Sequence, residues 1–159
     1  MILAGSRILV TGGAHGRGRV FAPDLAAAGT RVGACDMAAD GLADLEREAT
    51  AGGLSVWTQQ ADVSDEASVE RLCADFVAQS GGIDAVVNDA GLNRDGLLIK
   101  KTGETFERLP LASGQAVIDG ALTGVFLCAR EAAFHMASQG TGGVIVNGRI
   151  IPVDGELRL

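Results

Sequence analysis

The sequence predicts an α/β fold: one doubly wound parallel sheet with helices on both of its faces. Short β-branched runs alternate with helical segments along the whole chain, and this alternation is typical of parallel sheets. Apolar residues make up 47% of the 159 residues, so a single domain with its own core is expected over residues 1–159. Glycine occurs 23 times, about twice its usual frequency, and it gathers where strands should join helices. Because crossovers between parallel strands are right-handed, the helices should divide between the two faces.

Five short runs are predicted to form the parallel strands. Each lies between turn signals, and apolar residues dominate the runs, as expected for strands that are buried on both faces. The expected strands are residues 7–11, 31–36, 54–59, 83–88 and 144–147. A further apolar run, 149–153, follows the last of them closely.

The helices are predicted from apolar spacing and from the residues that begin and end them. They are expected from the first glycine cluster to Gly29, over 41–51, from an N-cap at Ser64 to Gly81-Gly82, and over 113–138. Leu42 and Leu45 should face the sheet from the second helix. The third helix carries an apolar stripe made of Val69, Leu72, Cys73, Phe76 and Val77.

The fourth predicted helix is the longest and follows a polar segment. Residues 93–110 are expected to form a polar connection without regular structure. The helix then places apolar side chains on one face, namely Val117, Ile118, Leu122, Val125 and Phe126. No apolar run is expected to approach the roughly 18 residues of a membrane span.

The turn after the first strand is suited to holding a diphosphate. It reads T-G-G-A-H-G-R-G. Gly12, Gly16 and Gly18 let the backbone turn tightly and approach a ligand, whose charge then lies on N–H groups at the start of the next helix. His15 and Arg17 would add positive charge there. We therefore expect these five residues to bind a dinucleotide.

Pro23 leaves the start of that helix open between two alternatives. If the helix begins at the glycine loop, Pro23 removes the hydrogen bond to the Arg19 carbonyl, at a cost of about 3 kcal/mol. If Pro23 is instead the first helical residue, the helix N-terminus lies away from Gly16 and Gly18, which would weaken diphosphate binding.

Asp36 ends the second strand and is the expected partner of the adenosine ribose. It follows the glycine loop at a distance typical of an acid that accepts hydrogen bonds from both ribose hydroxyls. The same carboxylate would repel a 2′-phosphate, so NAD is favoured over NADP as the cofactor. The alternative is that Asp36 only caps the strand.

Taken together, these motifs resemble the short-chain dehydrogenase/reductases, and most closely the branch that includes 3-oxoacyl-acyl-carrier-protein reductases. The resemblance rests on the glycine loop, on A-D-V at 61–63 and on N-D-A-G at 88–91, and it covers nearly the whole chain. It implies a Rossmann-like fold and hydride transfer between a nicotinamide and a carbonyl or alcohol. It also implies further cofactor-binding residues: Asp62 and Val63 at the adenine, and Asn88, Ala90 and Gly91 along the ribose side. Asp89 departs from the family form of the last motif, N-N-A-G.

The residues that carry out the family's chemistry are missing. The chain has no tyrosine, and Lys100 and Lys101, its only lysines, precede the long helix. Ala121 stands where the family has an asparagine, and no serine follows the last predicted parallel strand at 144–147. We therefore assign no catalytic residue and expect a catalytically impaired domain, truncated by the loss of an internal block between Asn147 and Gly148.

That loss constrains the run at 149–153. A parallel neighbour needs a crossover of a dozen or more residues, and none is present here. Asn147-Gly148 is a strong signal for a two-residue turn. The sequence therefore predicts either an antiparallel hairpin at the sheet edge or one continuous long strand.

Two other functions stay open at this point. A working oxidoreductase would need a substitute acid, for which His135, Asp89 and Asp119 are the candidates. A structural or interaction module would instead associate through an uncovered sheet face and an exposed edge, and we expect a homo-oligomer.

Composition narrows the partners and the compartment. With 13 Lys+Arg and 20 Asp+Glu, the net charge is -7, which speaks against nucleic acid or an anionic membrane as the main partner. Cys35, Cys73 and Cys128 lack metal-ligand spacing, so we expect buried thiols and no metal site. The start of the chain does not resemble a signal peptide, and a cytoplasmic protein is expected.

Overall fold

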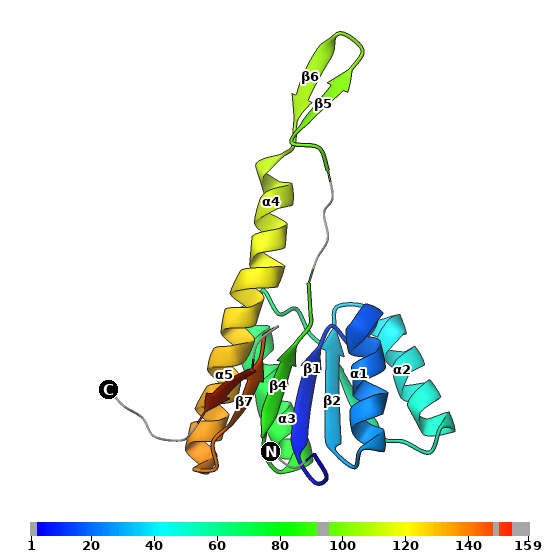
Figure 1. Ribbon diagram of the computed structural model, residues 1–159, viewed down its shortest axis with the longest axis vertical. Helices are drawn as coiled ribbons and strands as arrows, with labels where there is room; N and C mark the ends of the chain where they lie inside the picture. Colours follow the sequence, from blue (N-terminus) through cyan, green and yellow to red (C-terminus); the bar gives the residue numbers. More distant parts are fainter. Residues whose placement is uncertain (1–2, 92–95, 148–149, 154–159) are drawn as a thin grey trace.

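The computed structural model describes residues 3–91, 96–147 and 150–153. Within these ranges one sheet has the strand order β3-β2-β1-β4-β7-β8 (Figure 1). Its strands are β1 (Arg7–Thr11), β2 (Arg31–Asp36), β3 (Val56–Gln60), β4 (Ala85–Asn88), β7 (Gly143–Val146) and β8 (Ile150–Val153). The first five pair in parallel, and β8 is antiparallel to β7. The predicted α/β class and its parallel sheet are confirmed.

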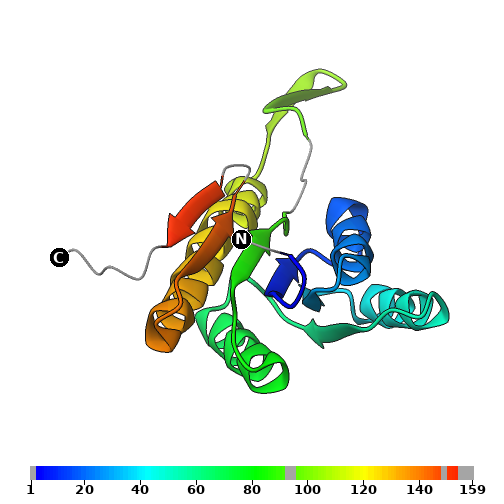
Figure 2. The same cartoon turned by 60° about the horizontal axis from the view of Figure 1, so that its bottom comes forward.

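Helices cover both faces of this sheet (Figure 2). α1 (Gly16–Ala27) and α2 (Ala39–Ala51) pack on one face, and α3 (Glu66–Ser80) and α5 (Gly124–Gln139) pack on the other. Burial on both faces explains why the residues of β1 are apolar without an alternation of apolar and polar side chains. Ile8 and Val10 are buried in the core under α1 and α2, whereas Leu9 is buried in the core under α3 and α5.

The start of α1 settles the question raised by Pro23. The helix begins at Gly16, directly in the glycine loop, so Pro23 lies inside it. The N-terminus of α1 therefore stays at the loop. In α2, Leu42 and Leu45 are buried as predicted.

α3 begins one residue later than predicted. Its N-cap is Asp65, whose carboxylate accepts a hydrogen bond from Ser68 N at 3.0 Å, so the assignment of Ser64 was wrong. Ser64 instead donates through its backbone N and its hydroxyl to Asp62 Oδ1. The predicted apolar stripe holds, since Val69, Leu72, Cys73 and Phe76 are all buried.

The polar connection contains structure that the sequence reading missed. Strands β5 (Ile99–Thr102) and β6 (Thr105–Arg108) form an antiparallel hairpin in which every residue is exposed. A two-residue turn joins them, and its first residue, Gly103, has a φ of +64°. Glycine at the first position of such a turn is a hairpin signal. Residues 92–95 of the connection lie outside the described ranges.

The long helix is one continuous run with a break in its pattern. α4 (Leu111–Ile118) passes through the π-helical turn η1 (Asp119–Thr123) into α5. In Figure 1, α4 rises beyond the end of the sheet and carries the β5–β6 hairpin beyond it. By length and composition alone this run could cross a membrane, contrary to expectation, and 17% of its most apolar stretch is buried. The second half of the run packs into the core through Leu127, Cys128, Ala132 and Met136.

The end of the described chain forms a hairpin. β8 pairs with β7 in a register that joins Val146 to Ile150 and Gly143 to Val153. Of the two alternatives, the antiparallel hairpin is therefore confirmed. Its connection spans the three residues 147–149 rather than the two that were predicted, and residues 148–149 lie outside the described ranges.

Candidate functional site

A crevice lies at the carboxyl ends of β1, β2, β3 and β4. Its volume is about 970 Å³. The strand order reverses direction at β1, because β2 lies on one side of it and β4 on the other. Parallel sheets bind ligands at such a reversal. The crevice is lined by the glycine loop, the end of β2, the segment after β3 and the segment after β4. Residues 116–117 of α4 and 119–121 of η1 complete the lining.

Two glycines shape the wall formed by the loop. Gly12 has a φ of +78°, and a Cβ on it would lie 2.9 Å from Ala90 N. A Cβ on Gly18 would overlap the Gly12 carbonyl oxygen. Side chains are therefore excluded where the loop meets α1 and where it meets the segment after β4.

The N-terminus of α1 opens onto this wall. His15 is its N-cap, with extended backbone, and makes no side-chain capping hydrogen bond. His15, Gly16 and Arg17 all line the crevice. A helix N-terminus presents N–H donors and a positive dipole end, so this arrangement fits an anion such as a diphosphate.

Asp36 both stabilises the glycine loop and lines the crevice. Its Oδ2 accepts from Ala14 N, and its Oδ1 accepts from Ala38 N, each at 3.1 Å. The carboxylate is half-buried and lines the crevice beside Met37. Each carboxylate oxygen has two lone pairs, so both can accept a further hydrogen bond from a ligand. The cap and the ribose-binding roles are therefore compatible in one residue.

The segment after β3 supplies the next part of the lining. Asp62 Oδ1 accepts from Ser64 N at 2.9 Å and from Ser64 Oγ at 2.7 Å. Asp62 N donates to Ser68 Oγ of α3 at 3.0 Å. Val63 packs closely on Gly124 of α5. A Cβ added to Gly124 would lie 2.7 Å from Cγ2 of Val63. Asp62 and Val63 are therefore held in place by both helices behind the crevice.

The segment after β4 is tied to β1. Thr11 Oγ1 accepts from Asp89 N at 3.1 Å and from Ala90 N at 3.0 Å. Ala90 and Gly91 line the crevice. Asn88 does not, because its Nδ2 donates to Asn147 Oδ1 at 2.6 Å and so links β4 to the end of β7. Gly18 also lies behind the lining rather than in it.

The sequence did not predict the ion pair that Arg17 and Asp89 form at the crevice. Arg17 Nη2 lies 2.7 Å from Asp89 Oδ1, with the Arg17 side chain 80% exposed and that of Asp89 10% exposed. The departure of Asp89 from the family motif was visible in the sequence. Its partner was not, because the two residues lie on different elements.

The three candidate substitute acids, His135, Asp89 and Asp119, do not all lie at the crevice. Asp89 and Asp119 line the crevice, and Asp119 Oδ1 accepts from Gln115 Nε2 at 2.7 Å. His135 is not part of the lining, and its Nε2 lies 3.5 Å from Glu131 Oε1 one turn earlier on α5. The structure therefore leaves the two aspartates as candidate acids at the crevice.

Cys35 adjoins the crevice, but its side chain is fully buried in the core under α3 and α5. Burial raises its pKa well above the usual range, so it is neither a thiolate ligand nor a nucleophile at neutral pH. Among the residues that the structure describes, no group of three or more His, Cys, Asp or Glu side chains is placed to hold a metal ion.

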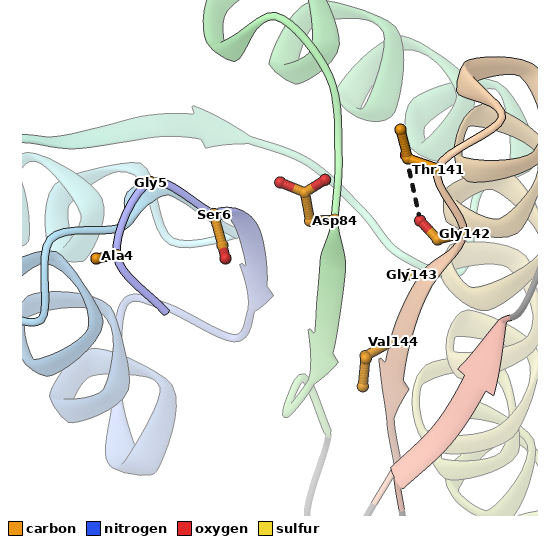
Figure 3. Close-up of a pocket in the computed structure, with 8 residues that line it drawn as sticks. All are labelled: Ala4, Gly5, Ser6, Asp84, Thr141, Gly142, Gly143 and Val144. Carbon is orange, nitrogen blue, oxygen red and sulfur yellow. Dashed lines mark hydrogen bonds between the residues drawn. The ribbon is translucent and has the colours of Figure 1, made fainter. Parts of the chain in front are cut away.

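A second hollow, of about 530 Å³, lies at the opposite ends of the strands (Figure 3). Its one charged group is Asp84, which is engaged by Arg7: Nε donates to Oδ2 at 2.8 Å and Nη2 to Oδ1 at 2.5 Å. Backbone N of Arg7 also donates to Oδ2. The Arg7 hydrogen bond lowers the pKa of Asp84. This pair joins the starts of β1 and β4, so its role is structural.

Comparison with known proteins agrees with this geometry. Residues 6–149 match the family described as short chain dehydrogenase. A 3-oxoacyl-[acyl-carrier-protein] reductase of Synechocystis is 36% identical over 138 residues, which cover 86% of this chain and 53% of that protein. The crystal structure of a short-chain type dehydrogenase/reductase from Mycobacterium marinum aligns with a TM-score of 0.79 and 31% identity, over 90% of this chain and 55% of that one.

One similar structure contains a dinucleotide. It is a short chain dehydrogenase from Burkholderia cenocepacia in complex with NADP, with a TM-score of 0.73 and 30% identity over 85% of this chain and 52% of that one. The chain thus spans about half the length of the relatives that it matches.

Proposed function

Because this chain belongs to the short-chain dehydrogenase/reductase family, we propose that its crevice binds NAD(H) in preference to NADP(H). The observation that carries the proposal is the carboxylate of Asp36 at the end of β2, facing the crevice beside the glycine loop. A carboxylate at this place accepts from ribose hydroxyls and repels a 2′-phosphate. The similar structure that contains NADP makes this preference a property to be measured on this chain.

We assign each part of the dinucleotide to a part of the lining. The backbone of the loop at Gly12 and Gly16, together with the first turn of α1, would hold the diphosphate. Asp36 would hold the adenosine ribose, and Asp62 with Val63 the adenine. Ala90 and Gly91 would border the second ribose. The close approach that Gly12 and Gly18 permit is the feature of the loop that such a ligand requires.

Titration with the two reduced cofactors tests this preference. NADH should bind more tightly than NADPH when followed by nicotinamide fluorescence and by calorimetry. Asp36→Asn keeps the size of the side chain and removes its charge, so it should narrow the ratio of the two dissociation constants by about tenfold. The matched control is Asp75→Asn, since Asp75 is exposed on α3 and bonded to Gln59 away from the crevice. No binding of NADH at millimolar concentration would refute the proposal.

We also propose that the domain as given is catalytically impaired. The bound dinucleotide would supply a hydride, but a reductase also needs a proton donor within hydrogen-bond reach of the substrate oxygen. The chain has no tyrosine, and Ala121 replaces an amide at the crevice. We expect no oxidation of NADH with a 3-oxoacyl thioester or with simple ketones. Turnover that is lost in Asp89→Asn or Asp119→Asn would show instead that an aspartate acts as the acid.

The exposed face of the long helix supports self-association as a second role. Ile118, Leu122 and Phe126 lie four residues apart on one side, and they are 48%, 67% and 59% exposed. Contiguous apolar surface of this kind favours association. Light scattering coupled to gel filtration should give the mass of a homo-oligomer, and Leu122→Lys should shift it toward the monomer. A monomer in the unsubstituted protein would exclude this role.

A further inference from the structure

The pair formed by Arg17 and Asp89 has a charge pattern that calls for a functional explanation. Arg17 is the second residue of α1, where the positive end of the helix dipole disfavours a cation. Its side chain is 80% exposed, so it is not part of the packed core. Asp89 is 10% exposed and lines the crevice that is proposed to bind a dinucleotide. A nearly buried carboxylate there would repel a diphosphate.

We propose that Arg17 is a positioning residue that neutralises Asp89 and thereby admits the diphosphate of the dinucleotide. This inference rests on the proposed function. Asp89 is fixed, because its backbone N donates to Thr11 Oγ1 on β1. Arg17 reaches it from the first turn of α1, and both residues line the crevice.

Arg17 also has donors beyond those that Asp89 uses. A guanidinium carries five N–H donors, and one nitrogen of Arg17 is placed on Asp89 Oδ1. The Arg17 side chain is 80% exposed, so its other donors are accessible to a ligand. Arg17 therefore offsets the carboxylate in the resting state and can donate to phosphate oxygens in the bound state.

This arrangement predicts that two substitutions change the affinity for NADH in opposite directions. Arg17→Gln leaves Asp89 as an unopposed negative charge, so NADH should bind about tenfold more weakly, or about 1.4 kcal/mol. Asp89→Asn restores the family's amide and releases Arg17 to the phosphates, so NADH should bind severalfold more tightly. The double variant should bind within about threefold of the unsubstituted protein.

The salt dependence of NADH binding distinguishes an electrostatic role of Arg17 from a purely structural one. In Arg17→Gln the repulsion by Asp89 is screened by added salt, so affinity for NADH should rise between 20 mM and 300 mM KCl. The unsubstituted protein and Asp89→Asn should lose affinity over the same range, because attraction is screened. Arg17→Lys keeps the charge and should recover most of the lost affinity. Arg47→Gln is the matched control, since Arg47 pairs with Asp44 on α2 outside the crevice lining and should leave binding unchanged.

The outcomes distinguish this inference from the proposed function. If the unsubstituted protein does not bind NADH, the proposed function fails first. If it binds but Arg17→Gln and Asp89→Asn both weaken binding, or Arg17→Gln shows no salt-induced gain, the inference alone is overturned. Circular dichroism of each variant confirms that the fold is intact, which the exposure of Arg17 leads us to expect.

Discussion

Single residues in the glycine loop determine how closely the backbone segments approach one another. Gly18 has no room for a Cβ, because the Gly12 carbonyl oxygen occupies that place. Gly114 in α4 differs, since nothing lies within 4 Å of its Cβ position. These two glycines therefore separate a steric requirement from simple helix propensity.

Alanine substitutions test that requirement. Gly18→Ala should lower the free energy of unfolding by about 1–3 kcal/mol, through overpacking, and should weaken NADH binding. Gly114→Ala should instead raise the free energy of unfolding by about 0.5–1 kcal/mol, because alanine favours the helix. Urea denaturation followed by circular dichroism measures both changes. Similar effects of the two substitutions would show that the close contact at Gly18 is relieved without cost.

Asp84 makes stability depend on pH at the amino ends of the strands. Arg7 lowers the pKa of its carboxylate in the folded protein below the ordinary value of about 3.9. A folded-state pKa below the unfolded one stabilises the protein above the unfolded value, and this stabilisation is lost as the pH falls through the folded value. Asp84→Asn should destabilise the protein at pH 7 and should reduce the loss of stability as the pH falls below the ordinary carboxyl pKa. An unchanged slope of stability against pH would contradict this.

Residue identity in the site was predictable where the signal was local. The glycine loop and Asp36 follow strands directly, so the spacing in the sequence fixes their place at the ends of β1 and β2. The ion pair of Arg17 and Asp89 was not predictable, because it depends on how α1 faces the segment after β4. The N-cap of α3 was misplaced since Ser64 and Asp65 are both good caps, and the structure gives Ser64 to Asp62 instead.

At the scale of elements, strands buried on both faces and glycine-ended helices were the most predictable. The five parallel strands appear within two residues of the expected bounds, since each short run lies between turn signals. The β5–β6 hairpin was missed because it buries nothing and so has no apolar pattern. Its signal was a two-residue turn beginning at Gly103, between strands with mixed polar side chains.

Pro23 gives α1 a measurable weakness. Within the helix, it cannot donate to the Arg19 carbonyl. Pro23→Ala should restore that hydrogen bond and raise the free energy of unfolding by about 1–2 kcal/mol, after allowance for the stiffer unfolded chain of the proline form. Asp24→Ala, at the next and exposed position, should gain only about 0.5 kcal/mol through helix propensity. A loss of stability in Pro23→Ala would mean that the ring packing of Pro23 outweighs the missing hydrogen bond.

At the scale of the whole molecule, the core under α3 and α5 encloses all three cysteines. Cys35, Cys73 and Cys128 are buried and unpaired by disulfides. Burial raises the pKa of Cys73 and of Cys128 to about 12, and also raises that of Cys35. Thiol reactivity therefore reports on opening of the core under α3 and α5.

Labelling with a thiol reagent at neutral pH measures that opening. We expect negligible reaction of the native protein and three equivalents in urea. NADH should slow any residual native reaction, since a ligand that binds only the folded form lowers the population of open states. Rapid native labelling of one cysteine would reveal a local opening that the packed structure does not account for.

The direction of β8 determines which end of the sheet Val153 reaches. Because β8 returns from Ile150 beside Val146 to Val153 beside Gly143, it runs from the crevice end of the sheet toward the opposite end. Four extended residues cover about 13 Å, so Val153 lies that far from the crevice end of the sheet. A proton donor grafted there would need a long return path, whereas one introduced on the π-helical turn at Ala121 would begin at the crevice wall itself. The π-helical turn, rather than β8, is therefore the place at which an introduced acid would adjoin the crevice.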